Sequence, residues 1–422
     1  MRIAMLSAHS SPIATLGGKE AGGMNVYVRE LSRELGRRGV AVDIFTRTQD
    51  EHAPLVVALD AGVRVINLRA GPATPYDKNW LLEHLPEFVR HVRCFADGED
   101  ISYDLIHSHY WLSGAAALEL RHAWGVPVVH MFHTLGALKN SVARSSEERE
   151  TLRRIEIERD IAAEADVLIA ATRRDRADLV RHTGATDDRI SVIPCGVDLM
   201  RFKPRDMATA RIMLDMPATP HKMVLLVGRI EPLKGIDALI EAIAMLHERR
   251  PEWRETLQAV VVGGGGEAQH DQWNAEQHRL HALRVRHGVA GAIHFAGAQP
   301  QGRLPLFYAA ADIVTMPSHY ESFGMAALEG LACGRPVVAT SAGGPAFIVE
   351  DGVSGLLTPP NDPAALADRL ERLLDDDSVR TEMAVAARER ATRFGWSSVA
   401  CEVLDVYRDL ITDNVPTLAI AG

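Results

Sequence analysis

The stretch "HYESFGMAALEGLACGRPVVATSAGG", which runs from His319 to Gly344, places two carboxylates in a segment that otherwise has the composition of a protein core. Glu321 and Glu329 are separated by seven residues, and nearly everything from Phe323 onward is small or apolar. A buried carboxylate is unfavourable unless something pairs with it. The pattern therefore indicates that these glutamates either reach solvent or face a cavity that holds a polar ligand.

The whole chain has 422 residues, of which 47% are hydrophobic, and this is enough for two globular domains. The net charge of -10 argues against nonspecific binding of nucleic acid. The four cysteines are far apart and fit neither a metal pattern nor a disulfide framework. No apolar run approaches the ~18 residues of a membrane span, and the first residues do not resemble a signal peptide. We expect a cytoplasmic protein.

Short apolar runs alternate with longer amphipathic segments, which is typical of βαβ units around a parallel sheet. In the first half, the pattern predicts helices over residues 24–38 and 114–124, and strands over residues 2–7, 40–47, 104–109, 126–134, 165–172 and 190–196. After "DLMRFKPRD" the pattern restarts, with a helix over 236–250 and strands over 223–230, 257–266, 292–297, 312–318 and 335–340.

The fold class is therefore α/β, with two doubly wound domains. We place an N-terminal domain at residues 1–200 and a C-terminal domain at 201–395. The segment 198–221, rich in proline and methionine, is predicted to be an interdomain linker. Residues 363–410 are predicted to be helical throughout, and residues 396–422 to form a helix that packs back on the first domain, with a loose tail.

The glycine-rich loop "GGKEAGGMNVYV" follows the first strand and opens a helix. Glycines let the backbone approach a ligand, and a helix N-terminus offers free N–H groups to an anion. The spacing is not G-x-G-x-x-G, and no acidic residue ends the second strand, which disfavours a nicotinamide site. An ordinary tight turn is the alternative.

The segment "GRIEPLKG" (Gly228 to Gly235) follows the first strand of the second domain, at the edge where open α/β sheets bind ligands. Arg229 and Lys234 lie five residues apart across a turn. Two cations that converge there suit a diphosphate, with arginine as a fork and lysine as a point charge. A solvated basic turn is the alternative.

The two glutamates of the opening stretch can now be interpreted. A helix is expected to begin near residue 322 or 323, and positions eight apart on a helix are rotated by about 80°. With Glu321 just outside the helix, both carboxylates can still border one crevice. A phosphate would bind the amides at the helix N-terminus, and sugar hydroxyls would bind Glu321 and Glu329. This predicts a nucleotide sugar; alternatively, Glu321 only favours the helix dipole and Glu329 is exposed.

The motifs "GRIEPLKG", "PSHYESFGMAALEGLACGRPVVAT" and "GGPAFIVEDGVSGLL" resemble the retaining glycosyltransferases of family 4. The resemblance covers nearly the whole chain. It implies the GT-B architecture, with two Rossmann-like domains facing across a cleft. In that architecture the N-terminal domain, residues 1–200, would bind the acceptor, and the C-terminal domain, residues 201–395, would bind the nucleotide sugar. It also implies a catalytic set of His133, Glu321, Arg229 and Lys234, and a donor site of Gly23, Arg229, Lys234, Glu321, Ser322, Phe323, Gly324, Met325 and Glu329. In the family, the matches of Glu321 and Glu329 hold the donor sugar and the ribose.

The first half, through "HSSPIATLGGKEAGGMNVYV", "YDLIHSHYWLSG" and "HMFHTLGALKN", is similar to D-inositol-3-phosphate glycosyltransferases of mycothiol biosynthesis. That resemblance implies an acceptor site of His9, Asn25, Lys78, Tyr110, Thr134 and Arg154. Each also has a plain structural interpretation: Asn25 as a helix cap, Tyr110 as core, and Arg154 as a partner of Glu158 at i,i+4. "RRIEIERD" around Arg154 also resembles sucrose-phosphate synthases.

We therefore expect a retaining enzyme that moves a sugar, N-acetylglucosamine or glucose, from a UDP-sugar to a phosphorylated polyol such as 1D-myo-inositol 3-phosphate. No metal or other cofactor is expected, since no D-x-D lies between a strand and a helix. The expected partners are small-molecule substrates, and a homodimer is one option. The alternatives are transfer to a hexose phosphate, a non-hydrolysing nucleotide-sugar epimerase and a non-catalytic nucleotide-sugar binder.

Overall fold

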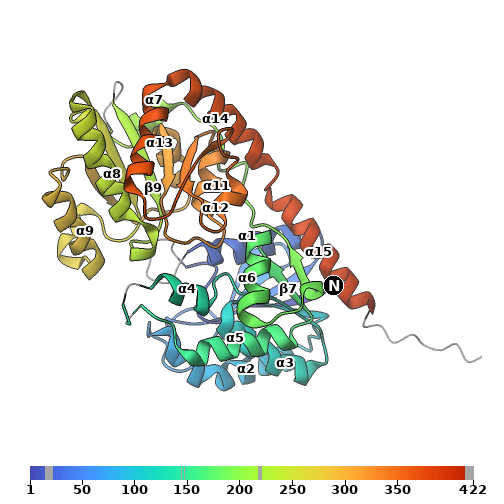
Figure 1. Ribbon diagram of the computed structural model, residues 1–422. Helices are drawn as coiled ribbons and strands as arrows, with labels where there is room; N and C mark the ends of the chain where they lie inside the picture. Colours follow the sequence, from blue (N-terminus) through green and yellow to red (C-terminus); the bar gives the residue numbers. More distant parts are fainter. Residues whose placement is uncertain (15–21, 144, 147, 217–220, 414–422) are drawn as a thin grey trace, which may run out of the picture. The chain divides into compact units, whose positions relative to one another are not determined.

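The computed structural model of the chain describes residues 1–14, 22–143, 145–146, 148–216 and 221–413, which form two compact units (Figure 1). The first unit contains Met1–Ala14, Gly23–Pro194 and the chain from Trp396 onward. The second contains Gly22 and Cys195–Gly395. The chain thus passes from the first unit to the second after Pro194 and returns at Trp396, and the described part of the segment predicted to be a linker belongs to the second unit.

The first unit is built on an eight-stranded sheet with the order β3-β4-β2-β1-β5-β6-β7-β8. Its neighbouring strands are parallel except for β3 and β4, which pair antiparallel at one edge. The central strands are almost wholly buried, which explains why the sequence shows them as unbroken apolar runs. The strands are β1 (Arg2–Leu6), β2 (Ala41–Arg47), β3 (Val56–Asp60), β4 (Val63–Leu68), β5 (Leu105–His109), β6 (Val128–Met131), β7 (Val167–Ala170) and β8 (Ile190–Val192).

Helices flank this sheet, and side-chain caps fix where several of them begin. The Thr151 and Thr172 hydroxyls cap α5 and α6 by accepting backbone N–H groups, and Gly125 ends α3 in the left-handed region. The last helix, α15, packs against α1, with the rings of Tyr27 and Trp396 in contact. The helices are α1 (Gly23–Arg37), η1 (Lys78–Trp80), α2 (Leu81–Gly98), α3 (Tyr110–Trp124), α4 (Gly136–Val142), α5 (Leu152–Glu164), α6 (Arg173–Thr183), η2 (Asp187–Arg189) and α15 (Trp396–Asp413).

The second unit has a six-stranded parallel sheet with the order β11-β10-β9-β12-β13-β14. Helix α8 contributes a nearly continuous buried face to the core of this unit. The strands are β9 (Lys222–Val227), β10 (Leu257–Val262), β11 (Ile293–Gly297), β12 (Ile313–Met316), β13 (Val337–Thr340) and β14 (Gly355–Thr358). The helices are α7 (Met207–Met213), η3 (Pro232–Lys234), α8 (Ile236–Arg249), η4 (Pro251–Trp253), η5 (Glu267–Gln272), α9 (Ala275–Arg286), α10 (Leu304–Ala310), α11 (Met325–Ala332), α12 (Pro345–Ile348), α13 (Pro363–Asp375) and α14 (Asp377–Thr392).

One predicted helix start in this unit is wrong, and the predicted C-terminal helical region is divided into separate helices. Helix α11 begins at Met325 rather than near residue 322, because Gly324 has a φ of 103° and interrupts the helical backbone. The C-terminal region is not one continuous helical stretch, since Asp376 ends α13 and its carboxylate caps α14 by accepting the amides of Ser378 and Val379.

Each sheet reverses its strand order at one point. In the first unit the chain proceeds from β1 to β2 and β4, then returns to add β5 on the other side of β1. In the second unit it proceeds from β9 to β10 and β11, then adds β12 on the other side of β9. In open α/β sheets, ligands bind at the carboxyl ends of the strands beside such a switch point. The fold therefore favours one site near β1 and β5 and another near β9 and β12.

The predicted linker is instead tied into the second unit by a buried arginine. Arg211, on α7, donates to the carbonyls of Ala310 and His221 and pairs with Asp312 at 2.9 Å. The Asp312 carboxylate also accepts the Met223 amide at 2.8 Å. Helix α7 is thus fastened to the start of β9, which composition alone did not reveal.

No helix in the described part of the chain is long and apolar enough to cross a membrane. The four cysteines are all free: Cys94 and Cys401 are exposed, and Cys195 and Cys333 are buried.

Replacing Arg211 by methionine tests this buried pair. Removing Arg211 takes the nearest cation from the buried Asp312 carboxylate and leaves only Arg380, at 3.8 Å, as a charged partner. We expect a loss of about 3 kcal/mol in the free energy of unfolding. This loss is measured by urea denaturation, from the unfolding transition of the second unit. The matched control is Arg249→Met, since Arg249 is 40% exposed and its pair with Asp368 lies at the surface. Equal losses in the two variants would contradict a structural role for Arg211.

Candidate functional site

Several predicted acceptor residues lie together at the carboxyl ends of β1, β5 and β6. His9 follows β1, Tyr110 is the first residue of α3 directly after β5, and Thr134 follows β6. The ring centroids of His9 and Tyr110 are 4.4 Å apart. Strands β1 and β5 flank the switch point of the first unit and β6 lies next to β5, so the fold places these side chains where a ligand site is expected.

Backbone strain marks the same edge of the sheet. Tyr110 has a φ of 73° and His133 a φ of 61°, in the left-handed region that bulky side chains rarely adopt. Elsewhere in the described chain, the non-glycine residues with positive φ are Asp and Asn, which tolerate it. Strain of this kind persists only where the surroundings enforce it, and it concentrates at functional sites.

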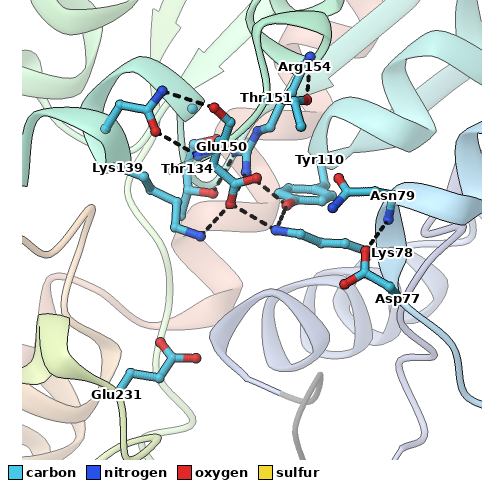
Figure 2. Close-up of polar contacts among 12 residues, drawn as sticks. Asp77, Lys78, Asn79, Tyr110, Thr134, Lys139, Glu150, Thr151, Arg154 and Glu231 are labelled. Atoms are coloured by element: carbon cyan, nitrogen blue, oxygen red, sulfur yellow. Dashed lines mark hydrogen bonds and ion pairs between the residues drawn. The ribbon is translucent and has the colours of Figure 1, made fainter. Parts of the chain in front are cut away.

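Three cations converge on one carboxylate beside Tyr110 (Figure 2). The Nζ atoms of Lys78 and Lys139 lie 2.8 and 2.5 Å from Oε1 of Glu150, and Nη1 of Arg154 lies 2.9 Å from the same oxygen. The Tyr110 hydroxyl accepts a hydrogen bond of 3.0 Å from Lys78. We call Lys78, Tyr110, Lys139, Glu150 and Arg154 the anion cluster.

Arg154 is the most enclosed member of this cluster, with no exposed side-chain surface. Nε donates to Glu158 at 2.6 Å, and Nη1 donates to the Tyr110 hydroxyl at 3.0 Å. Nη2 donates to the carbonyl of Thr134 at 2.9 Å and to its hydroxyl at 3.2 Å. The predicted pairing with Glu158 at i,i+4 is therefore confirmed, and it coexists with contacts to two other predicted acceptor residues.

The electrostatics of the cluster favour its charged forms. Burial disfavours the ionised Glu150 carboxyl, but Arg154, Lys78 and Lys139 more than offset this and lower its pKa to about 2. For Lys78, burial likewise disfavours the charge, yet Tyr110 and Glu150 raise its pKa overall. At neutral pH the cluster is thus a set of ion pairs that needs an anion at its centre.

Asn25 is not the helix cap that one interpretation of the sequence made it. Because α1 begins at Gly23, Asn25 lies inside the first turn, where it is buried. Its Nδ2 donates to the Ser10 hydroxyl at 2.6 Å and to the Ser11 carbonyl at 2.7 Å. It fixes the loop after β1 that carries His9; its predicted contact with an acceptor stays a prediction.

His133 belongs to a group of four histidines on β5, on β6 and just after β6: His107, His109, His130 and His133. His107 accepts or donates a 2.6 Å hydrogen bond with Tyr407 of α15, and His109 Nδ1 lies 3.1 Å from His133 Nε2. Burial lowers the pKa of His107 and of His133 to about 3, and it lowers the pKa of His109 and His130 as well. The four rings are therefore neutral in the folded protein.

In the second unit, the predicted donor residues gather at the carboxyl ends of β9 and β12. Lys234, on η3, pairs with Glu321 at 2.5 Å, and both side chains are mostly buried. Arg229 is 44% exposed and pairs with Glu231 at 2.8 Å. The structure thus brings Lys234 and Glu321 together and leaves Arg229 at the surface of this unit.

Glu321 is held in place by a close approach of two backbone segments. The Gly344 amide donates to the Glu321 carbonyl at 2.8 Å. Gly343 has a φ of 81°, and a Cβ there would lie 2.1 Å from the same carbonyl oxygen. Only glycine fits at residue 343, which explains why the "GG" after β13 accompanies the glutamate.

Glu329 is buried on α11, so the alternative that it is exposed is wrong. Its Oε2 accepts a 2.6 Å hydrogen bond from the hydroxyl of Tyr308, which comes from α10. Burial, followed by the charge of Glu329, raises the pKa of Tyr308 well above its usual value. Likewise, Glu321 does more than favour a helix dipole, since it carries an ion pair.

The remaining predicted donor residues are placed as follows. Gly23 is the first residue of α1. Ser322 and Met325 are half-buried beside Glu321, whereas Phe323 and Gly324 are buried. The glycine-rich loop before Gly22 lies outside the described residues.

Sequence reasoning missed three residues of these sites: Lys139, Glu150 and Tyr308. Glu150 lies four residues before Arg154, the same spacing that identified Glu158, but Thr151 caps α5 between them and no periodicity connects the two. Lys139 is one of only six lysines in the chain, which was a usable signal. Nothing in the sequence indicated Tyr308.

Two glycosyltransferase family models match the chain, one in each half. The family model "Glycosyltransferase Family 4" matches residues 21–201, and "Glycosyl transferases group 1" matches residues 217–390. The chain is 43% identical to a protein of Acidothermus cellulolyticus named D-inositol 3-phosphate glycosyltransferase, over 98% of this chain and 91% of that protein. It is 44% identical to D-inositol 3-phosphate glycosyltransferase 2 of Catenulispora acidiphila, over 98% and 96% of the two chains.

Among solved structures, the sucrose-phosphate synthase of Thermosynechococcus elongatus superposes with a TM-score of 0.88 at 35% identity. The match covers 98% of this chain and 99% of that one.

The neutral histidines predict an acid-sensitive first unit. Their pKa values are lower in the folded than in the unfolded chain, so below about pH 6.5 only the unfolded chain takes up these protons. The free energy of unfolding should fall by about 1 kcal/mol for each histidine between pH 7 and pH 5.5. Asp175, whose pKa burial raises to about 6, acts in the opposite direction but is a single group. The loss at Glu150 begins only below about pH 4.5.

Urea denaturation of variants at several pH values measures this slope. His107→Gln should remove one histidine's share, whereas His52→Gln, at an exposed position, should leave the slope unchanged. A slope that is the same in both variants would show that the buried group does not cause it.

Proposed function

The chain belongs to glycosyltransferase family 4, and from this premise we propose that it transfers a sugar from a UDP-sugar to a phosphorylated polyol such as 1D-myo-inositol 3-phosphate. Its two α/β units with parallel sheets have the GT-B architecture of its structural neighbours. The relatives that match over the full length carry the name D-inositol 3-phosphate glycosyltransferase, which supports this class of acceptor.

The anion cluster is the observation that carries the proposed acceptor class. Lys78, Lys139 and Arg154 converge on a single oxygen, at the carboxyl ends of strands that border the switch point. Cations gathered at that edge suit a phosphate dianion, and the Tyr110 and Thr134 hydroxyls can add hydrogen bonds. A neutral acceptor would bring no negative charge to pair with these cations.

On the donor side, the proposal assigns the diphosphate to Lys234 and Arg229 and the sugar hydroxyls to Glu321. Negative charge grows on the departing phosphate in the transition state, so a fixed cation there stabilises the transition state selectively. Lys234 is held by Glu321 before the donor arrives, which keeps the ammonium group oriented.

The proposal includes retention of the anomeric configuration and no requirement for a metal. Protein cations take the place that a divalent ion would hold beside the diphosphate. NMR of the product tests the first point, since a β linkage from an α donor would exclude retention. Activity that disappears with a chelator and returns with magnesium would exclude the second.

A second candidate is transfer to a hexose phosphate. The specific observation in its favour is the 35% identity to a sucrose-phosphate synthase over almost the whole chain. The anion cluster serves either acceptor, since both carry a phosphate. A UDP-release screen of several UDP-sugars against inositol 3-phosphate, fructose 6-phosphate and free inositol separates the two candidates.

The acceptor prediction is tested by Lys78→Met. Losing one charge-assisted contact to phosphate should raise the KM for the phosphorylated acceptor by about ten- to a hundredfold, while calorimetric binding of the UDP-sugar stays unchanged. Lys203→Met, at an exposed position of the second unit, is the matched control. If free inositol serves as well as its phosphate in the wild-type protein, the acceptor class is wrong.

The donor prediction is tested by Lys234→Ala, which should lower kcat by about a hundredfold because it removes a group that acts on the leaving phosphate. Lys234→Arg should recover part of the activity, since it restores the charge but not the geometry. Unchanged turnover in Lys234→Ala would refute the assignment.

A further inference from the structure

We propose that the Glu150 carboxylate occupies the position that the acceptor's phosphate takes during turnover, so that Glu150 acts as a built-in competitor that determines which acceptors can enter. This inference rests on the proposed function, since it concerns the same acceptor site. It is carried by the way the contacts of Arg154 are filled, by the charge balance of the cluster and by the anchoring of Glu150.

The first argument is that all three side-chain nitrogens of Arg154 already have partners within the protein. Arg154 donates hydrogen bonds to Glu158, to the Tyr110 hydroxyl and to both oxygens of Thr134, while its Nη1 forms an ion pair with Glu150 at 2.9 Å. Its side chain has no exposed surface. Glu158 also accepts the Gly136 amide and belongs to the same helix, which leaves Glu150 as the exchangeable partner.

The second argument is charge. Lys78, Lys139 and Arg154 face the carboxylates of Glu150 and Glu158, which leaves a single positive charge in excess. A phosphate dianion that replaces Glu150 brings the cluster to neutrality. A phosphate that enters while Glu150 stays would leave a negative excess in a mostly buried place, which is unfavourable. The two anions therefore exclude each other.

The third argument is the fit of the oxygens. All three cations contact the same atom, Oε1 of Glu150, so a single oxygen is shared among three positive charges. A phosphate monoester has three terminal oxygens and can give each cation its own. The exchange thus improves the geometry of the hydrogen bonds while it keeps every cation paired.

The anchoring of Glu150 shows how the exchange can proceed. The Asn140 side chain holds the backbone of Glu150: it accepts a hydrogen bond from the Glu150 amide at 2.7 Å and donates one to the Glu150 carbonyl at 3.1 Å. With the backbone held, the carboxylate leaves by side-chain rotation and returns to the same cations afterwards. A neutral acceptor offers no charge to replace it, so Glu150 keeps the site closed to unphosphorylated molecules.

The test is calorimetric binding of inorganic phosphate to the full chain at fixed pH and ionic strength. Glu150→Gln preserves the shape of the side chain and removes the competing charge. We expect it to bind phosphate about ten- to a hundredfold more tightly than the wild-type protein, the range for a charge-assisted contact. Glu156→Gln is the matched control, since Glu156 lies nearby in the sequence, on α5, but is exposed and pairs only weakly with Arg153 at 3.6 Å. It should bind phosphate as the wild-type protein does.

Adding Lys78→Met to Glu150→Gln should abolish the gain, which places the bound phosphate in the cluster. If Glu150→Gln does not fold, Glu150→Asp serves, because its shorter side chain cannot reach all three cations; it should give a smaller gain in the same direction. Phosphate binding that is equal or weaker in the folded variant overturns the inference, as does a gain that survives Lys78→Met.

The outcome is independent of the test of the proposed function. If turnover depends on a phosphorylated acceptor but Glu150→Gln binds phosphate no more tightly, the function stands and the competitor is refuted. If phosphate binding tightens as expected but free inositol is used as well as its phosphate, the competitor stands and the acceptor class falls.

Discussion

The buried guanidinium of Arg154 is the constraint on which the first unit's site depends. It joins the end of β5 through Tyr110, the end of β6 through Thr134, and its own helix through Glu158. A charge with no exposed surface is tolerated only when its hydrogen bonds are complete, so each of these groups is held in position by the same requirement. The strained backbone at Tyr110 is understandable in this light, since it places the hydroxyl where both Arg154 and Lys78 can donate to it.

In the second unit, charged side chains are likewise paired within the fold, but fewer residues are involved. Lys234 and Glu321 come from segments that follow neighbouring strands, and they form an ion pair in a mostly buried place. Glu329 is satisfied by Tyr308 in the same manner. In both units, groups expected to meet a charged or polar ligand are already paired with a side chain of the protein. A ligand that takes these contacts must therefore offer better partners than those it displaces.

The sequence was sufficient to predict what depends on local pattern. Buried parallel strands appear as apolar runs, and so the central strands of both sheets and helix α8 were located closely. The edge hairpin of β3 and β4 was missed because its strands are only partly buried and lack a continuous apolar run. The linker prediction failed at Arg211, since nothing local distinguishes a buried arginine from a solvated one. Glu150 and Tyr308 were missed for a related reason, because their partners lie on other elements of the fold. The roles predicted for individual site residues rest on the family resemblance and on chemistry that only activity measurements can test.

The interleaving of the two units along the chain has a consequence for biosynthesis. The first unit includes α15, whose Tyr407 bonds to the buried His107 and whose Trp396 packs on Tyr27. On the ribosome, these residues emerge only after the entire second unit has been made. Residues 1–194 therefore lack α15, and the side chains that it covers stay exposed, until the second unit has been synthesised. Cys195–Gly395 is a continuous segment and can fold during that time. Translation speed through the second half of the message thus sets how long that apolar surface is open to chaperones.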